Sequence, residues 1–150
     1  MFIIIAIILI FLADLFIKAW ARKALVDKDI DKAKGHIRFN LLYNSGAAMG
    51  IFSSHKKVLN VITILVVAFL LLVAPEYLKK NTSLLEKLGY TFATAGALNN
   101  SYERLFKGRV TDYISFPKFP GKIKNIVFNI SDFLIMIGAV LLAVGSFFKK

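Results

Sequence analysis

Three long apolar runs constrain this chain more than any other feature. Residues 2–21 (FIIIAIILIFLADLFIKAWA) contain only two charged side chains, Asp14 and Lys18, and residues 58–75 and 125–148 are similarly apolar. A helix needs about 20 predominantly apolar residues to cross the hydrocarbon core of a bilayer. The whole chain is 57% hydrophobic and only 19% charged, which is too apolar for an ordinary soluble domain. The sequence therefore predicts an integral membrane protein.

Residues 84–105 form a weaker fourth candidate span, because their C-terminal end is polar. Small residues at 89, 93, 96 and 97 would let such a helix pack closely inside a bundle. Pro75 is expected to end the second span. We therefore predict an all-α membrane protein that forms a single domain over residues 1–150, with both termini on one side. Its four transmembrane helices are expected at about 2–21, 58–75, 84–105 and 125–148.

The segments between these spans differ in character. Residues 22–57 begin with a polar turn region, after which Ile37, Phe39 and Leu41 alternate as in a half-buried strand. Residues 106–124 contain two prolines among several lysines, which is typical of a loop at the membrane interface. We expect a small β-containing loop region after the first helix and an interfacial loop before the last.

Composition excludes several classes of functional site. The chain has no cysteine, and its two histidines, His36 and His55, are too few for a multi-histidine metal centre. No nucleophile elbow and no glycine-rich nucleotide-binding motif is present. The net charge of +11, in a chain this apolar, suits anionic membrane headgroups better than nucleic acid. We expect no cofactor, no metal and no nucleic-acid partner.

Ionisable residues inside membrane spans are costly, and they are functional candidates for that reason. Asp14 and Lys18 stand at i and i+4, so they share one helix face and can neutralise one another. We interpret them as a structural polar pair rather than as catalytic groups. Asp132 follows Asn129 by three residues and has no basic residue at helical spacing. It is either satisfied by hydrogen bonds or kept for chemistry.

Asp112 follows the third span in the sequence RLFKGRVTDYI, where a lone carboxylate is usually solvated. The third and fourth spans run antiparallel, however, so the end of one and the start of the other lie on the same side. Asp112 and Asp132 can then meet at the membrane surface, where two adjacent carboxyls hold one proton between them. The ionised member takes a proton from water while the protonated member polarises a scissile carbonyl. This pattern predicts chemistry of the aspartic-protease type.

Five short motifs follow one another along the chain. They are DLFIK, with Asp14 and Lys18; NSGAAMGIF, with Asn44, Gly46, Ala47 and Ala48; GALNNSYER, with Gly96, Ala97, Asn100 and Arg104; GRVTDY, with Asp112; and FNISDFLI, with Asn129 and Asp132. In this order they resemble the motifs of the lipoprotein signal peptidases, the signal peptidase II family. Met49, Asn99 and Glu103 depart from the family pattern of phenylalanine, glycine and aspartate, but they leave both candidate carboxyls in place.

The resemblance implies an intramembrane aspartic endopeptidase that removes signal peptides from diacylglyceryl-modified prolipoproteins, cutting before the lipidated cysteine. Asp112 and Asp132 would be its catalytic dyad, and Asp14 with Lys18 would brace the helices. The residues that position substrate and dyad would be Asn44, Gly46, Asn100, Arg104 and Asn129. The resemblance also implies inhibition by globomycin-type cyclic peptides. We expect a monomer surrounded by phospholipids in the bacterial cytoplasmic membrane, with the active site and the β-containing region on the extracytoplasmic side.

Two other functions stay open on the sequence alone. A divergent paralogue would bind lipopeptides or lipids without turnover, and a small transporter would use Asp14, Lys18 and Asp132 as a proton relay.

The sequence gives conflicting signals about the orientation of the chain in the membrane. Residues 22–57 and 104–124 carry 8 and 6 basic residues, against 3 in residues 76–87 and 2 at the C-terminal end. The positive-inside rule would place the two long segments in the cytoplasm, whereas the motifs place them outside, and we follow the motifs.

Overall fold

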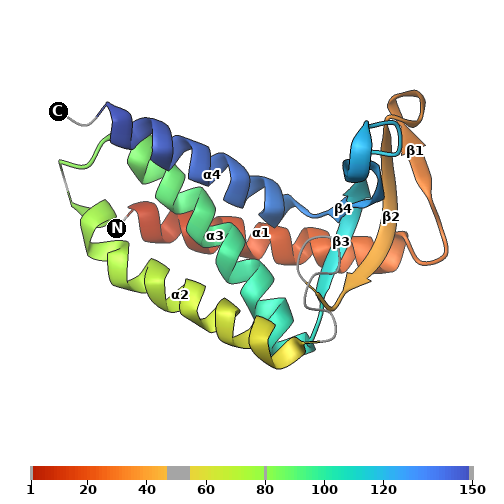
Figure 1. Cartoon of the computed structure of the whole chain (residues 1–150), viewed down its shortest axis with the longest axis horizontal. Helices are drawn as coiled ribbons and strands as arrows, with labels where there is room; N and C mark the ends of the chain where they lie inside the picture. Colours follow the sequence, from red (N-terminus) through yellow and green to blue (C-terminus); the bar gives the residue numbers. More distant parts are fainter. Residues whose placement is uncertain (1, 47–54, 80, 149–150) are drawn as a thin grey trace. The chain divides into compact units, whose positions relative to one another are not determined.

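The computed structural model describes residues 2–46, 55–79 and 81–148 of the chain. This part is mostly helical and includes a small antiparallel sheet, as predicted (Figure 1). Its helices are α1 (Phe2–Ala24), α2 (Lys56–Leu78), α3 (Leu84–Lys107) and α4 (Ile130–Phe147). Its strands are β1 (Ile30–Lys32), β2 (Ile37–Asn44), β3 (Val110–Ser115) and β4 (Val127–Phe128), with short 3-10 turns η1 (Ala33–Gly35) and η3 (Gly121–Asn125).

Within the described ranges, three helices are long and apolar enough to cross a membrane, namely α1, α2 and α4. Each presents apolar side chains to its surroundings; Phe16, Leu72 and Val140 are all more than half exposed. Exposed apolar surface on this scale indicates contact with lipid. Helix α3 is less hydrophobic than these three helices, because its second half contains buried polar residues such as Asn99 and Glu103.

Two of the predicted helix ends are wrong. Pro75 does not end the second helix, since it lies inside α2, which continues to Leu78. A proline this close to a helix end removes only one backbone hydrogen bond, and membrane helices tolerate it. The last helix begins at Ile130 rather than at residue 125, because the preceding residues form β4 and pair with β3.

The chain divides into two compact units. Unit 1 comprises Met1–Asp14, Ile62–Ser101 and Ile130–Lys150, and therefore holds the first part of α1, most of α2 and α3, and α4. Unit 2 comprises Leu15–Val61 and Tyr102–Asn129, and therefore holds the sheet together with the adjoining ends of α1, α2 and α3.

Small residues let α3 and α4 pack closely in unit 1. A Cβ atom added to Gly96 would lie 2.5 Å from the carbonyl oxygen of Ser131, and one added to Gly138 would lie 2.5 Å from the backbone nitrogen of Ala93. Neither position has room for a side chain, because the two backbones approach each other directly. This agrees with the close packing that the small residues of the third span predict.

Polar side chains of α3 bind the backbones of two further helices in unit 1. The Asn99 amide donates from Nδ2 to the carbonyl of Phe11 in α1 at 2.9 Å. The Tyr90 hydroxyl donates to the carbonyl of Leu70 in α2, also at 2.9 Å. These bonds satisfy polar groups that would be costly in an apolar bundle. Tyr90 and Asn99 are therefore part of the packing of unit 1 rather than exposed to solvent.

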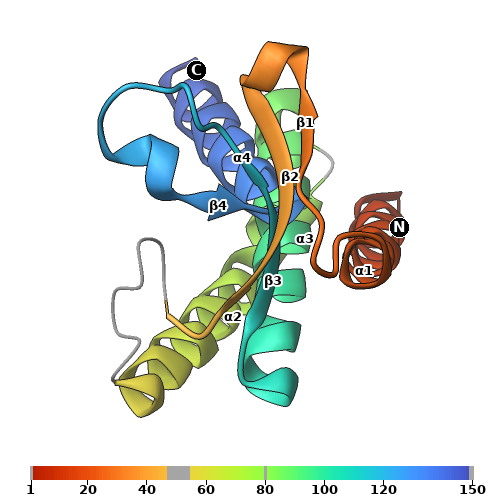
Figure 2. The same ribbon diagram turned by 90° about the vertical axis from the view of Figure 1, so that its right-hand side faces the viewer.

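Unit 2 is built on an antiparallel sheet with the strand order β1-β2-β3-β4 (Figure 2). The strand predicted from the alternation in residues 37–41 is present as β2. The prediction of an interfacial loop over residues 106–124 is wrong in part, because β3 lies within it. Five of the six residues of β3 are buried, so the sequence VTDYIS shows no alternation between apolar and polar positions.

The edge strand β1 lies where the sequence predicts a polar turn. All three of its residues are exposed, and a charged pair joins it to β2. The Arg38 side chain donates from Nε to the Asp31 carboxylate at 2.7 Å, and this hydrogen bond lowers the pKa of Asp31. A surface ion pair, which hydropathy does not reveal, therefore joins this strand to β2 in addition to the backbone pairing.

Candidate active site

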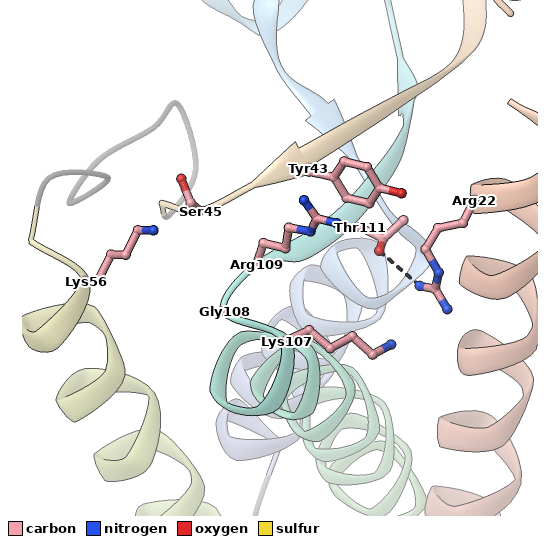
Figure 3. Close-up of a pocket in the computed structure, with 8 residues that line it drawn as sticks. All are labelled: Arg22, Tyr43, Ser45, Lys56, Lys107, Gly108, Arg109 and Thr111. Carbon is pink, nitrogen blue, oxygen red and sulfur yellow. Dashed lines mark hydrogen bonds between the residues drawn. The ribbon is translucent and has the colours of Figure 1, made fainter. Parts of the chain in front are cut away.

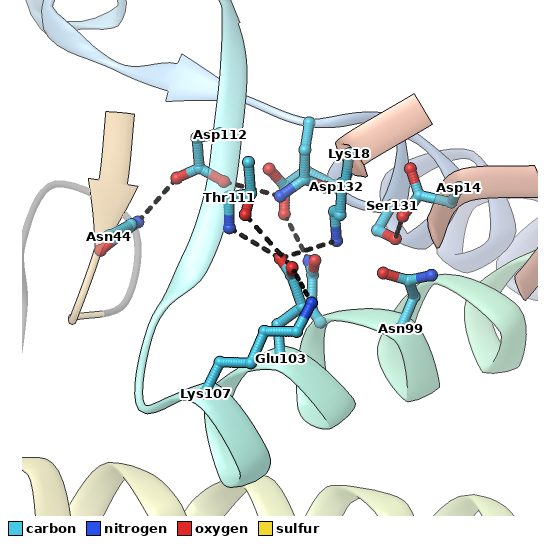
Figure 4. A network of polar contacts seen from close by, with 12 residues as sticks. Asp14, Lys18, Asn44, Asn99, Glu103, Lys107, Thr111, Asp112, Ser131 and Asp132 are labelled. Atoms are coloured by element: carbon cyan, nitrogen blue, oxygen red, sulfur yellow. Dashed lines mark hydrogen bonds and ion pairs between the residues drawn. The ribbon is translucent and has the colours of Figure 1, made fainter. Parts of the chain in front are cut away.

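The Asp112 carboxylate lies on β3 and is almost completely buried, with 2% of the residue exposed. Both of its oxygens accept hydrogen bonds from asparagine side chains. Asn129 donates from Nδ2 to Oδ1 at 2.6 Å, and Asn44 donates from Nδ2 to Oδ2 at 3.0 Å (Figure 4). Asn44 is the last residue of β2, and Asn129 immediately precedes α4. Neutral amide donors therefore hold both oxygens of this carboxyl.

The Asn44 amide is itself held in one orientation. The Gly46 backbone N–H donates to Asn44 Oδ1 at 2.9 Å, which leaves the amide nitrogen directed at Asp112. The Gly46 carbonyl accepts a hydrogen bond from Arg104 Nη2 at 3.1 Å. The turn after β2 is thus joined both to Asp112 and to the end of α3. The remaining residues of this motif, 47–52, which include Ala47, Ala48 and Met49, lie outside the described residues.

Asp132 stands in the first turn of α4 and also accepts a hydrogen bond from an asparagine. Asn100 of α3 donates from Nδ2 to Asp132 Oδ1 at 2.8 Å. The N-terminal turn of a helix favours a negatively charged side chain, because its backbone N–H groups carry partial positive charge. Asp112 and Asp132 therefore share one feature, since an asparagine amide donates to each of them.

Asp14 and Lys18 of α1 are both buried, at 2% and 0% exposed. The Ser131 hydroxyl of α4 donates to the Asp14 carboxylate. The Lys18 ammonium lies 3.8 Å from the Glu103 carboxylate of α3. Each residue thus contacts a side chain of another helix, which suits a bracing role. That Asp14 and Lys18 neutralise each other's charge stays a prediction.

Glu103 is the centre of a charged cluster that the sequence analysis missed. Its carboxylate is fully buried and lies close to three cationic side chains and one backbone donor, of which Figure 4 shows Lys18, Lys107 and Thr111. These are Lys18 at 3.8 Å, Arg22 at 2.8 Å, Lys107 at 2.9 Å and the Thr111 backbone N–H at 2.8 Å. Because Thr111 directly precedes Asp112, the cluster also anchors β3 at the candidate site. The spacing of Glu103 to Lys107, i and i+4, was the available sequence signal.

Replacing Glu103 by glutamine should destabilise the protein, because three cations would then surround a buried neutral group. Removing one partner of a buried ion pair costs about 3 kcal/mol or more, which corresponds to a melting temperature lowered by roughly 6–12 °C. The measurement is thermal unfolding of the purified protein in detergent. The matched control is Glu76→Gln, which removes an exposed pair with Lys79 and should lower the melting temperature by less than about 2 °C. Equal shifts in the two variants would contradict the role given to the cluster.

Comparison with known proteins identifies the family. The family model described as signal peptidase (SPase) II matches residues 6–148. A lipoprotein signal peptidase of Clostridium novyi is 34% identical over 136 residues, which cover 87% of each chain. A lipoprotein signal peptidase of Shewanella oneidensis is 37% identical over 149 residues, covering 96% of this chain and 85% of the other.

Solved structures share the fold. A bacterial membrane enzyme determined by the in meso method at 2.3 Å resolution superposes with a TM-score of 0.78, covering 97% of this chain and 87% of the other at 23% identity. A second one, at 1.9 Å resolution, gives a TM-score of 0.77 at 22% identity and covers 99% and 94%. The sequence matches extend over nearly the whole chain and exceed 30% identity. On these grounds the chain belongs to the signal peptidase II family.

Proposed function

We propose that this protein is an intramembrane aspartic endopeptidase that removes signal peptides from diacylglyceryl-modified prolipoproteins, cutting just before the lipidated cysteine. Family membership makes it a signal peptidase, and the relatives compared above are lipoprotein signal peptidases. The observation that carries the aspartic mechanism is the shared environment of Asp112 and Asp132, to each of which asparagine amides donate. In this proposal the two carboxyls form the catalytic dyad.

The proposed dyad works with one carboxyl ionised and the other protonated. The ionised carboxyl takes a proton from water as the water attacks the scissile carbonyl, and the protonated one donates a hydrogen bond to the carbonyl oxygen. Chain connectivity supports this pairing. Asn129, which donates to Asp112, precedes Asp132 by only three residues. The Cα atoms of Asn129 and Asp132 are therefore at most about 11 Å apart.

The asparagines have a distinct part in this mechanism. An amide N–H does not titrate in the physiological range, so it orients a carboxyl without exchanging a proton with it. Asn44, Asn100 and Asn129 are therefore positioning residues in the proposal. Arg104 and Gly46 belong to the same group, because their mutual hydrogen bond connects the turn after β2 with α3. Asp14 and Lys18 brace α1 against its neighbours.

The proposal places the protein in the bacterial cytoplasmic membrane as a monomeric single domain with four spans. The fourth span would be α3, whose polar side chains are buried in contacts such as that of Asn99 with Phe11. The sheet and both candidate carboxyls would face the extracytoplasmic side. The cleavage site of a lipidated precursor lies there, near the headgroups, so an inward-facing dyad would be about 30 Å away from it.

A cleavage assay with a matched pair of precursors tests the proposal. The purified protein is incubated with a prolipoprotein whose cysteine carries a diacylglyceryl group, and with the same precursor lacking the lipid. We expect cleavage of the lipidated form alone, at the bond before the cysteine as measured by mass spectrometry, and inhibition by globomycin. Equal cleavage of both forms would contradict the lipid requirement. Retention of the lipidated precursor without cleavage would instead support a non-catalytic lipopeptide binder.

A further inference from the structure

A basic pocket in unit 2 has no part in the proposed cleavage. It encloses about 570 Å³, and Figure 3 shows side chains from α1, α2, the end of β2 and the α3–β3 connection around it. Its lining includes Arg22, Tyr43, Lys56, Lys107, Arg109 and Thr111. Tyr43 pairs with Thr111 across β2 and β3. Because successive residues of a strand face opposite sides, Asn44 and Asp112 lie on the other face of the sheet.

The pocket carries a large excess of positive charge. Four of its lining side chains are cationic, and among the described lining residues none is acidic. Two of the four, Arg22 and Lys107, contact the buried carboxylate of Glu103. Four cations against one carboxylate leave a net charge of about +3. Such a concentration of positive charge favours a multiply hydrogen-bonded anion.

One of the arginines is already held in place. The Arg109 guanidinium lies over the Tyr43 ring, with its Cζ atom 3.8 Å from the ring centre, in a cation–π contact. This contact restrains the guanidinium, whose N–H groups form a planar fork that suits an acceptor with paired oxygens. An arginine edge presented in this way matches the paired oxygens of a phosphate.

The positions of these cations in the chain place the pocket at headgroup depth. Arg22 lies in the last turn of α1 and Lys56 is the first residue of α2, and both helices are apolar enough to cross a membrane. Lys107 is the last residue of α3. Within two residues of Arg22 and Lys107 in the sequence stand two exposed aromatic side chains, Trp20 (54% exposed) and Phe106 (77% exposed). Aromatic and basic residues at the ends of spanning helices are typical of the interface between hydrocarbon and headgroups.

We propose that this pocket binds the phosphate of an anionic phospholipid headgroup. Phosphate is the anion that is abundant at this depth, and its oxygens suit both the arginine edge and the lysine ammonium groups. The diacylglyceryl group of the proposed substrate contains no phosphate, so the pocket is a second lipid site. A lipid bound there would connect the ends of α1, α2 and α3 within unit 2.

Lipid titration followed by native mass spectrometry tests this proposal without reference to peptidase activity. The protein in detergent is titrated with dioctanoyl phosphatidylglycerol and, separately, with zwitterionic dioctanoyl phosphatidylcholine. We expect the anionic lipid to bind at least about tenfold more tightly. The variant Lys56→Gln/Arg109→Gln should weaken its binding roughly thirty-fold, since each basic residue near an anionic headgroup contributes about a fivefold factor.

The matched control is Lys122→Gln/Lys124→Gln, which removes the same charge from η3 and should change binding less than about twofold. Among the described residues, Glu103 forms ion pairs with Lys18, Arg22 and Lys107 rather than with Lys56 or Arg109, and an unchanged melting temperature would show that the variant is folded. Should the double variant not fold, Lys56→Gln alone should weaken binding about fivefold.

Several outcomes would overturn the proposal. One is equal binding of the two lipids to the unmodified protein, and another is an equal loss in the test and control variants. Glycerol 1-phosphate that displaced the lipid at equimolar concentration would identify a soluble phosphate compound as the ligand. Displacement by hexaglutamate would indicate an acidic polypeptide instead. Failure of both competitors at a hundredfold excess would support the lipid headgroup.

Discussion

Substituting either Asp112 or Asp132 by asparagine should lower the rate of cleavage of a lipidated precursor by at least about a hundredfold, because general acid–base catalysis contributes that much or more. Asparagine has nearly the same size as aspartate but cannot accept or release the proton that the proposed mechanism moves. The measurement is the initial rate of product formation by mass spectrometry. The melting temperature of each variant in detergent should stay within a few degrees of the unmodified protein.

The control for this prediction is Asp31→Asn, which removes an exposed carboxyl from the same unit. Asp31 pairs with Arg38 at the edge of the sheet, so its loss should leave the cleavage rate within about twofold. A rate above a few per cent of the unmodified protein in either Asp112→Asn or Asp132→Asn would rule out the dyad. It would leave the family assignment intact, since that depends on the sequence matches.

Cysteines introduced at Lys34 and Lys122 should react with a membrane-impermeant thiol reagent in intact cells, and a cysteine at Lys79 should not. Lys34 belongs to η1 and Lys122 to η3, both in unit 2, whereas Lys79 directly follows α2. Helix α2 is long enough to cross the membrane, so its two ends are expected on opposite sides. The expected contrast is complete labelling at two positions against none at the third, read by mass shift.

The absence of native cysteine makes the labelling unambiguous, because the unmodified protein should give no signal at all. In permeabilised cells all three cysteines should react, which shows that protection at position 79 comes from the membrane. The reverse pattern is what the excess of lysine and arginine in residues 22–57 and 104–124 favours under the positive-inside rule. That result would refute the proposed orientation, and with it access of an extracytoplasmic precursor to the dyad.

The long helices could be predicted because their signal is local. An apolar run of about 20 residues already specifies a membrane helix, whatever the rest of the chain does. The residues at which these helices begin and end could not be predicted from hydropathy in the same way. Hydropathy does not distinguish residues 125–129 from the helix that follows, whereas pairing with β3 does, and that pairing depends on a strand buried on both faces.

The candidate site was predictable only in part, for a related reason. Asp112, Asp132 and the asparagines stand in motifs, so their presence is visible in the sequence. Which amide donates to which carboxyl depends on the fold. In the structure, Asn44 and Asn129 donate to Asp112, and Asn100 donates to Asp132. In the sequence, Glu103 stands out only as a glutamate where the family pattern has an aspartate. Its contacts with Lys18 and Arg22 join residues more than 80 positions apart, which no local pattern could show.

The hydrogen bond from the Gly46 N–H to Asn44 has a consequence for the Asp112 carboxyl. A primary amide can face a carboxyl with either of its two ends, and the ends have opposite effects. The nitrogen end stabilises the deprotonated carboxyl, whereas the oxygen end would stabilise the protonated one. By holding the amide oxygen, the Gly46 N–H selects the nitrogen end for Asp112. In this way a single main-chain N–H, which does not itself contact the carboxyl, sets the hydrogen-bond donor at its Oδ2 atom.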